Sequence, residues 1–262
     1  MIPYLHFGPL EIPTFGLMVA LALLTAANIL QRDFDRRGVE ADAFLMITVA
    51  GLAGIAGAKI MHLIDTPDDR VALSLFFDRH WLFSQNGLNW LRLGFAWFGG
   101  FLGGFGAMLV MGWREKLPMW EFLDASSPAA CFGYAIGRIG CFLSGDGDYG
   151  KPTSLPWGMS FPKGIVPTTE RVHPTPLYEL VVWCLIGWVL WRLGAKTLKR
   201  PMGEIFCLYL ILTGAARFLV EIIRINPVWI WGMSSAQVAS VACVIAGALL
   251  LWRVKSVTPA QK

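Results

Sequence analysis

Apolar residues run in long stretches along the whole chain, with shorter polar segments between them. A helix needs about 20 mostly apolar residues to cross a membrane, because each residue rises only about 1.5 Å. Backbone groups in lipid must pair within their own segment, which favours helices. Seven windows qualify: residues 14–31, 42–64, 94–112, 119–143, 174–194, 203–224 and 235–253. We therefore predict an all-α polytopic protein with seven transmembrane helices in a single membrane domain, residues 1–262.

Two longer segments separate these windows. Residues 65–93 mix Phe and Trp with Asp, Arg and Asn, which is typical of an interfacial segment. Residues 144–173 form the longest polar insertion and are rich in Gly, Pro and Asp. Both are predicted to be extracytoplasmic. The start of the chain has no basic segment before its first apolar run, so no cleaved signal peptide is expected.

The composition agrees with a membrane protein. Hydrophobic residues make up 55% of the chain, and only 15% of residues are charged, against about a quarter in soluble domains. No run of Lys and Arg of the nucleic-acid-binding type occurs, so no nucleic-acid partner is expected. The five cysteines lie in or beside apolar segments without ligand spacing, which argues against disulfides and structural zinc. We predict no cofactor and no metal.

The distribution of Lys and Arg predicts the orientation, because cytoplasmic loops carry the excess of these residues. With the N-terminus outside, the cytoplasmic loops and tail hold twelve: Arg32, Arg36, Arg37, Arg114, Lys116, Arg192, Lys196, Lys199, Arg200, Arg253, Lys255 and Lys262. The outer segments, which are longer, hold six: Arg70, Arg79, Arg92, Lys151, Lys163 and Arg171. The sequence therefore predicts an outside N-terminus and a cytoplasmic C-terminus.

Six charged residues fall inside the predicted spans and, in this orientation, share one depth near the outer leaflet. A charge at the centre of a span costs about 3 kcal/mol on insertion scales, so such residues face a polar interior or a cavity. They come from four different spans: Lys59, Arg138, Glu179, Arg217, Glu221 and Arg224. Their convergence predicts a polar pocket toward the outer leaflet.

The sixth span has the most defined spacing. Arg217, Glu221 and Arg224 lie at i, i+4 and i+7, so they share one helix face. Arg217 and Glu221 are expected to pair, while Arg224 and Lys59 have the alternative of snorkelling to the interface. Arg138 lies among several glycines, which favours close helix packing around its guanidinium.

A cationic pocket at this depth suits the headgroup of an anionic phospholipid. A guanidinium holds a phosphate through two parallel hydrogen bonds, which a lysine ammonium does not. The apolar walls would then hold the acyl chains. Charge placement alone thus leads to the hypothesis that the pocket binds a phospholipid.

The segment GRIGCFLSGDGDYG, residues 137–150, resembles the signature of bacterial prolipoprotein diacylglyceryl transferases, Gly-Arg-x-Gly-Asn-Phe-x-Asn-x-Glu. Cys141 and Ser144 stand in place of its two Asn, and Asp146 stands in place of its Glu. The resemblance extends along essentially the whole chain. It includes HPTPLYE at 173–179, ARFLVEIIR at 216–224, GAKI at 57–60 and FGLMVALA at 15–22.

The resemblance implies transfer of a diacylglyceryl group from phosphatidylglycerol to the lipobox cysteine of a prolipoprotein. The thiol forms a thioether and glycerol phosphate leaves, at the outer face of the bacterial cytoplasmic membrane. Arg138 is then expected to hold the lipid and Arg217 to be essential, since cations stabilise the charge that develops on the leaving phosphate. The expected substrate-binding residues are Lys59, Arg138, Cys141, Ser144, Tyr178, Glu179, Arg217, Glu221 and Arg224.

Two positions depart from the family pattern. The family has a His before the Gly-Gly of the third span, proposed to help activate the thiol, and this chain has Phe98 there. The family's Tyr near the start of the first span is Phe15. Asp146, Asp148 and His173 are the candidate substitutes for the base, because partial burial raises the pKa of a carboxylate.

Simpler readings of these residues stay open. GDGDYG is also typical of a plain turn after a helix, although its oxygens hint at a divalent cation. His173 has the alternative of a helix-entry residue beside Pro174 and Pro176. Cys141 is either a small buried residue or a nucleophile that forms a covalent intermediate.

The same residues bear on other classes of function. A transporter is disfavoured, because the polar residues occupy the outer half, little beyond Asp124 lies in the inner half, and no repeat of spans is found. A retinal or ligand receptor is another class with seven spans, and a retinal Schiff base in the last span is excluded because residues 235–252 contain no Lys. A diverged family member that uses another anionic phospholipid or acceptor, or a lipid-binding protein without transferase activity, remains open.

Overall fold

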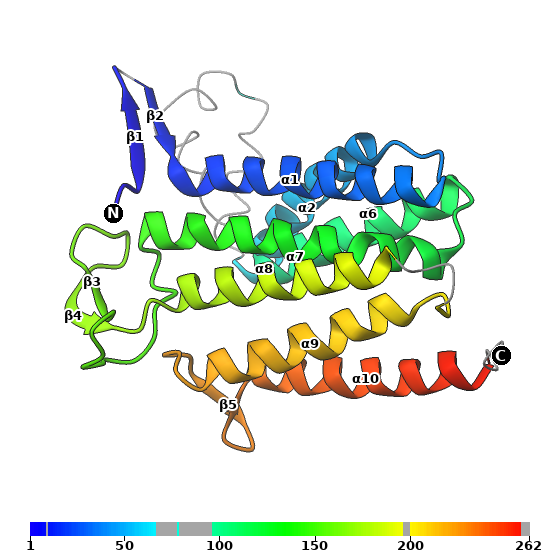
Figure 1. The fold of residues 1–262 in the computed structure, drawn as a ribbon. Coiled ribbons are helices and arrows are strands. Elements are labelled where there is room, and N and C mark those ends of the chain that lie inside the picture. The colour runs from blue at the N-terminus through cyan, green and yellow to red at the C-terminus, as the bar shows by residue number, and fades with distance from the viewer. Residues whose placement is uncertain (9, 67–77, 79–95, 196–199, 258–262) are drawn as a thin grey trace. The chain divides into compact units, whose positions relative to one another are not determined.

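The computed structural model describes residues 1–8, 10–66, 78, 96–195 and 200–257 (Figure 1). They form two compact units, Met1–Ala41 with Pro118–Lys262, and Asp42–Leu117. The first unit contains five long helices: α1 (Thr14–Arg37), α7 (Met119–Ser144), α8 (Thr175–Gly194), α9 (Glu204–Glu221) and α10 (Ser235–Val257). The second unit contains α2 (Ala43–Asp65) and α6 (Trp97–Arg114). The single membrane domain, residues 1–262, stays a prediction.

The helices coincide with the seven apolar windows of the sequence. Four of them, α1, α2, α8 and α10, are long and apolar enough to cross a membrane by length and composition. The prediction of a helical membrane protein is therefore confirmed, whereas seven crossings and their orientation stay predictions. Most of the predicted interfacial segment 65–93 lies outside the described residues, as do Lys196, Lys199 and Lys262.

Three short antiparallel hairpins flank the helices of the first unit, and the sequence did not predict them. They are β1–β2 (Tyr4–Phe7 and Leu10–Pro13), β3–β4 (Met159–Phe161 and Thr168–Val172) and β5–β6 (Val228–Ile230 and Met233–Ser234). All three lie at the same end of the five helices, which we call the hairpin end (Figure 1). The backbone N–H of Ile2 donates to the carbonyl of Leu143, which ties the start of the chain to the end of α7 there.

The helix α7 stops because Gly145 adopts a left-handed conformation, with φ of 60°. Its N–H donates to the carbonyl of Cys141, and glycine takes this conformation without a Cβ penalty. The chain therefore turns out of the helix immediately before Asp146 and Asp148. This turn is what carries the two carboxylates back over the end of α7.

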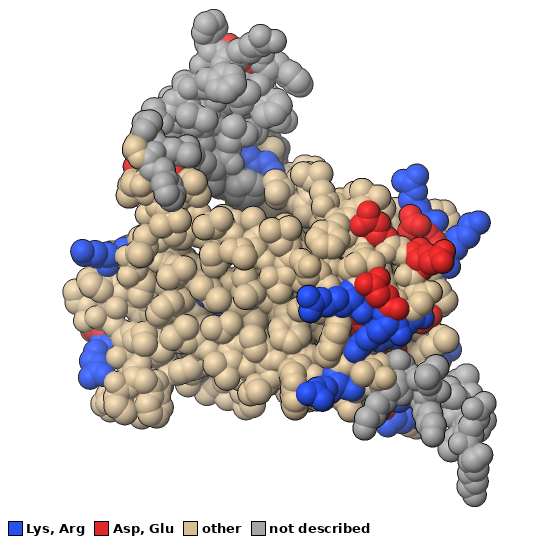
Figure 2. Space-filling model, turned by 45° about the horizontal axis from the view of Figure 1, so that its top comes forward, with Lys and Arg blue, Asp and Glu red and all other residues tan. Residues whose placement is uncertain are grey.

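The five helices of the first unit pack in sequence, α1 on α7, α7 on α8, α8 on α9 and α9 on α10. A buried apolar cluster lies in the middle of this packing: Cys131, Ala135, Trp183, Ile186, Leu190 and Ile205. Figure 2 shows one face of the molecule, on which charged side chains gather toward the ends and the surface between is almost entirely uncharged. Both features are expected of helices that lie in lipid.

A cluster of buried polar side chains lies at the end of the first unit opposite the hairpins. The carboxylate of Asp33 is fully buried and pairs with Arg36 and Arg37, the latter at 2.8 Å. Asp124 accepts hydrogen bonds of 2.8 Å from the backbone N–H groups of Gly203 and Phe206, so it caps the start of α9. The sequence pointed only to Asp124 in this half, and the structure adds the buried Asp33 cluster to it.

In the second unit, α2 and α6 approach so closely that their backbones touch. A Cβ built on Gly103 would overlap the carbonyl oxygen of Ala53, and one on Gly99 would overlap that of Gly57. The N–H of Ala96 donates to the carbonyl of Ala58 at 3.0 Å, just before α6 begins. Small residues at four-residue spacing allow this contact, as in other membrane helix pairs.

We predict that Gly103→Ala lowers the stability of the protein by about 1–3 kcal/mol, because the added methyl group forces the two helices apart. Gly106→Ala is the matched control, since no atom of the described residues, apart from its chain neighbours and its own helix backbone, lies within 4 Å of its Cβ position. The control keeps or slightly raises stability, because Ala favours a helix more than Gly. Unfolding temperatures in detergent measure both, and equal values for the two variants would refute the close contact.

Candidate functional site

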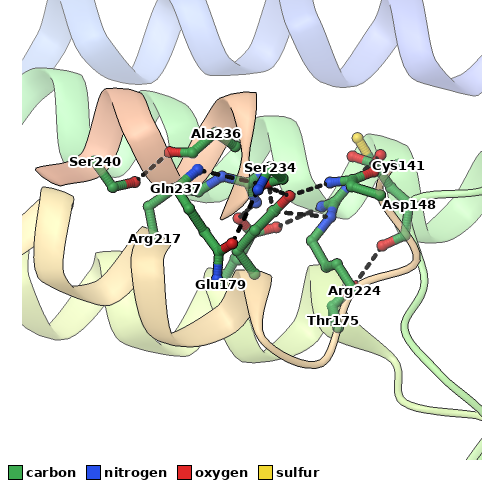
Figure 3. Close-up of polar contacts among 12 residues, drawn as sticks. Cys141, Asp148, Thr175, Glu179, Arg217, Arg224, Ser234, Ala236, Gln237 and Ser240 are labelled. Atoms are coloured by element: carbon green, nitrogen blue, oxygen red, sulfur yellow. Dashed lines mark hydrogen bonds and ion pairs between the residues drawn. The ribbon is translucent and has the colours of Figure 1, made fainter. Parts of the chain in front are cut away.

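A single buried carboxylate, Glu179, lies at the centre of a charged cluster at the hairpin end. Its Oε1 accepts from the Tyr134 hydroxyl at 2.9 Å and from Arg217 Nη1 at 2.8 Å. Its Oε2 lies 3.0 Å from Arg138 Nε and 3.4 Å from Arg224 Nη1. Figure 3 shows the side chains of Glu179, Arg217 and Arg224 pointing toward one another. One carboxylate in the first turns of α8 thus joins three arginines from separate parts of the chain.

Arg138 occupies the last third of α7 and is largely buried, with 13% of its side chain exposed. Besides Glu179, its guanidinium contacts the carboxylate of Asp148 and the hydroxyl of Tyr134, and it lies 4.7 Å over the Tyr134 ring. Its Nη1 also donates to Cys141 Sγ at 3.6 Å. The sequence did not single out Tyr134 as a site residue. Tyr134 lies one helical turn before Arg138, and this spacing could have predicted that the two side chains meet.

The predicted pair of Arg217 and Glu221 is confirmed, with 2.8 Å between Arg217 Nη2 and Glu221 Oε2. The other oxygen of Glu221 accepts from Ser234 Oγ at 2.7 Å and from the side-chain amide of Asn226. Glu221 is therefore held from both sides, by an arginine and by the base of the β5–β6 hairpin. The sequence missed Ser234 and Asn226, because their contact depends on how the hairpin folds back.

Arg224 follows the end of α9 and is only 7% exposed. It contacts Asp148 and Glu179, and its Nε lies 3.7 Å from Glu221 Oε2. The alternative that Arg224 snorkels to the interface is wrong, because three carboxylates hold its guanidinium inside the cluster. Its backbone forms a bridge with Gly150, which fastens the loop after α7 beside it.

The GDGDYG loop is docked onto the ends of α8 and α9. Thr175 Oγ1 donates to the carbonyl of Asp148, the N–H of Gly150 donates to His173 O at 2.8 Å, and that of Lys151 donates to Ile223 O at 2.8 Å. This docking places the carboxylate of Asp148 between Arg138 and Arg224. The segment is a turn, as the simpler reading held, and it also supplies one arm of the charged cluster.

The two aspartates of the loop differ in their electrostatics. Burial acts to raise the pKa of Asp148, but the charges of Arg224 and Arg138 outweigh it and leave the pKa below its usual value. Burial raises the pKa of Asp146, and the negative charge of Asp148 raises it further. Of the two, Asp146 therefore binds a proton more readily, and Asp148 stays charged.

Three other candidate side chains have hydrogen-bond partners other than the arginines. His173 Nδ1 lies 3.2 Å from the hydroxyl of Tyr178, which accepts from Trp157 Nε1 at 2.8 Å. Ser144 is fully buried, and its hydroxyl donates to Cys141 O at 3.2 Å. The roles given to these side chains stay predictions.

Two further positions that the sequence singled out, Lys59 and Phe98, belong to the second unit. Lys59 lies on α2, partly buried, and Phe98 lies on α6, largely exposed. The structure brings together five of the six charged residues that the sequence placed at one depth, and the position of Lys59 relative to them stays a prediction.

The Cys141 thiol and the Asp146 and Asp148 carboxylates lie within 4.8 Å of one another, a spacing that could hold a metal ion. Asp148 already pairs with two guanidinium groups, however. A cation there would meet the repulsion of Arg138 and Arg224 at short range. The arrangement suits an anion better than a metal.

The fold and this cluster define a helical membrane protein with buried arginines that are suited to a phosphate group. The model of the family described as prolipoprotein diacylglyceryl transferase matches residues 3–253, so the chain belongs to that family.

Several relatives carry the name phosphatidylglycerol–prolipoprotein diacylglyceryl transferase. The one from Clostridium tetani is 30% identical over 92% of this chain and 92% of its own length. The one from Leifsonia xyli is 32% identical over 95% of this chain and 76% of its own, and the one from Prochlorococcus marinus is 29% identical over 95% and 89%.

We predict that Glu179→Gln lowers stability by about 3–5 kcal/mol, because it leaves three buried arginines without their shared counter-charge. Glu170→Gln, at an exposed position of β4, removes the same charge and serves as the control. Thermal unfolding in detergent and the yield of monodisperse protein measure the effect. An unfolding temperature of Glu179→Gln equal to that of the control would show that Glu179 does not hold the cluster together.

Proposed function

We propose that this protein transfers the diacylglyceryl group of phosphatidylglycerol to the lipobox cysteine of a prolipoprotein. The observation that carries the proposal is the set of Arg138, Arg217 and Arg224, each largely buried, in a chain that the family model matches from residue 3 to residue 253. Guanidinium groups bind phosphate oxygens in pairs, and they are worth most where water is excluded. The relatives' name supplies the donor and the acceptor.

In the proposed reaction, the thiolate sulfur attacks the glycerol carbon of the lipid that carries the phosphate. A C–S bond forms, the C–O bond to phosphate breaks, and glycerol phosphate leaves with the bonding electrons. The thiol proton passes to a base and then to the leaving phosphate, so that the charges balance. Arg138, together with Arg217 and Arg224, which share Glu179 with it, stabilises the phosphate as its negative charge grows, which is where positioned cations accelerate a reaction.

Asp146 is the base that we propose. Its pKa is raised by burial and by Asp148, which makes it a better proton acceptor than an ordinary aspartate. Asp148 is less suitable, because Arg224 and Arg138 hold it in its charged, weakly basic form. Asp146 also stands where the family signature has Glu, whereas Phe98 has no group that takes a proton.

The proposed setting is the bacterial cytoplasmic membrane, with seven crossings, the N-terminus outside and the site facing the outer leaflet. The end opposite the hairpins supports this orientation, because α1 ends with Arg36 and Arg37, and α8 with Arg192. Arg200 lies at the same end, 3.2 Å from Glu204 in the first turn of α9. Lys and Arg mark the cytoplasmic side of membrane proteins.

A second candidate is transfer from another anionic phospholipid or to another acceptor. Three residues depart from the family signature, Cys141, Ser144 and Asp146, and Phe98 replaces its His. These differences favour a change of substrate over a change of reaction type. Transport is disfavoured, since the apolar cluster around Trp183 and Leu190 lies between the two polar ends of the first unit.

We predict that purified protein in phosphatidylglycerol vesicles modifies a lipobox peptide, and that Arg138→Ala lowers the rate by about 10²–10³-fold through loss of a phosphate contact. Lys163→Ala, at an exposed position on the same side, removes an equal charge as the control. Mass spectrometry of the peptide measures transfer. If well-folded protein transfers no group from any anionic lipid, the transferase proposal is wrong and the protein only binds lipid.

The proposed base predicts a pH profile. Because Asp146 must be deprotonated, kcat/KM should rise with pH through an apparent pKa above the usual aspartate value of about 4. Asp146→Asn should lower the rate by about 10²–10⁴-fold, and the residual rate should follow ionisation of the peptide thiol, near pH 8.5. An unchanged acidic limb in the variant would show that another group takes the proton.

A further inference from the structure

Three carboxylates balance the three arginines, and they differ in their access to solvent. The side chain of Glu179 is 0% exposed and that of Glu221 is 1% exposed, whereas that of Asp148 is 31% exposed. The cluster is formally neutral with all six groups charged. Asp148 is therefore the one anion of this set that faces the outside of the cluster.

Asp148 binds the arginines as a phosphate group would. Its Oδ2 contacts Arg138 Nη1 and its Oδ1 contacts Arg224 Nη2, so two oxygens of one anion bridge two guanidinium groups. A phosphodiester also carries one negative charge on two free oxygens. Arginine accepts carboxylate and phosphate in the same forked geometry.

The other two carboxylates have no comparable freedom. Glu179 accepts from Tyr134 and Arg217 and pairs with Arg138 and Arg224. Glu221 is held by Arg217 on one oxygen and by the side chains of Ser234 and Asn226 on the other. Neither can leave without stranding buried partners, which is costly.

We infer that Asp148 is an exchangeable anion, which holds the phosphate position between Arg138 and Arg224 until a phosphodiester displaces it. A lipid anion added to the intact cluster would leave one buried charge uncompensated, whereas exchange with Asp148 keeps the cluster neutral. The carbonyl of Asp148 stays fastened by Thr175, so the side chain turns outward while the loop remains docked.

The exchange makes Asp148 a specificity-determining residue. An incoming group has to engage both arginines with oxygens of one anion, because a single contact does not replace the bridge. That requirement favours phosphodiesters and disfavours uncharged lipid headgroups. The identity of the anion as phosphatidylglycerol rests on the proposed function, whereas the exchange itself rests on the geometry of Asp148.

The exchange predicts that the Asp148 carboxylate becomes reactive when the lipid binds. Full-length protein in dodecyl maltoside, a detergent without phosphate, with and without added phosphatidylglycerol, is treated with a water-soluble carbodiimide and glycine ethyl ester, and peptides are quantified by mass spectrometry. We expect labelling of Asp148 to rise several-fold with phosphatidylglycerol, while labelling of Glu170 stays constant. Parallel samples with glycerol phosphate or inorganic phosphate distinguish a free phosphate from a lipid headgroup as the displacing anion.

The outcomes separate the two proposals. Transfer to a lipobox peptide without a rise in Asp148 labelling would overturn the exchange and leave the transferase intact. A rise without transfer to the peptide would support the exchange and count against the transferase. A rise in Asp148 labelling with free phosphate but not with phosphatidylglycerol would support the exchange and show that a lipid headgroup is not the displacing anion.

Variants test the same competition by affinity. Removal of the internal competitor in Asp148→Asn should tighten phosphatidylglycerol binding by roughly tenfold, whereas Asp148→Glu keeps an anion there and should bind as the wild type does. Glu170→Gln controls for net charge. Weaker binding by folded Asp148→Asn would show that the carboxylate only supports the structure, and if that variant does not fold, the labelling of wild-type protein decides.

Discussion

The structure of the hairpin end depends on the burial of one carboxylate, Glu179, among three arginines. Each arginine comes from a different place: Arg138 from α7, Arg217 from α9 and Arg224 from the turn after α9. A buried charge without its partner costs several kcal/mol, so these segments must meet at Glu179 for the unit to be stable. The start of α8 thereby holds the last part of α7, the end of α9 and the loop after α7 together.

This constraint also supplies the chemistry that we propose. The arginines are held in place before any ligand arrives. Glu179 and Glu221 pair with them, and the ring of Tyr134 stacks on the guanidinium of Arg138. A site arranged in advance stabilises developing charge without reorganisation during the reaction. Its arginines are balanced by carboxylates, so its affinity for an anion depends on which of those carboxylates can be displaced from the arginines. Asp148 is the one with that access.

The helices were predictable because their signal is local. The windows 119–143 and 174–194 match α7 and α8 within one residue at each end, since length and apolarity define them. The shared face of Arg217 and Glu221 was also predictable from helical spacing. The bridging by Asp148 was not, because it depends on hydrogen bonds from the loop to His173 and Ile223, far away in the sequence. The role of Glu179 as the common partner likewise appears only once three segments are brought together.

The central claim is that the arginine cluster holds the lipid phosphate. Solid-state NMR can measure dipolar coupling between the phosphorus of bound phosphatidylglycerol and arginine side chains labelled with ¹⁵N, in full-length protein in nanodiscs. The account predicts clear coupling to guanidinium nitrogens, which weakens in Arg138→Lys prepared in the same way, because the Arg138 contribution is lost while that of Arg224 stays. Bound phosphatidylglycerol with no coupling to any arginine nitrogen would contradict the account.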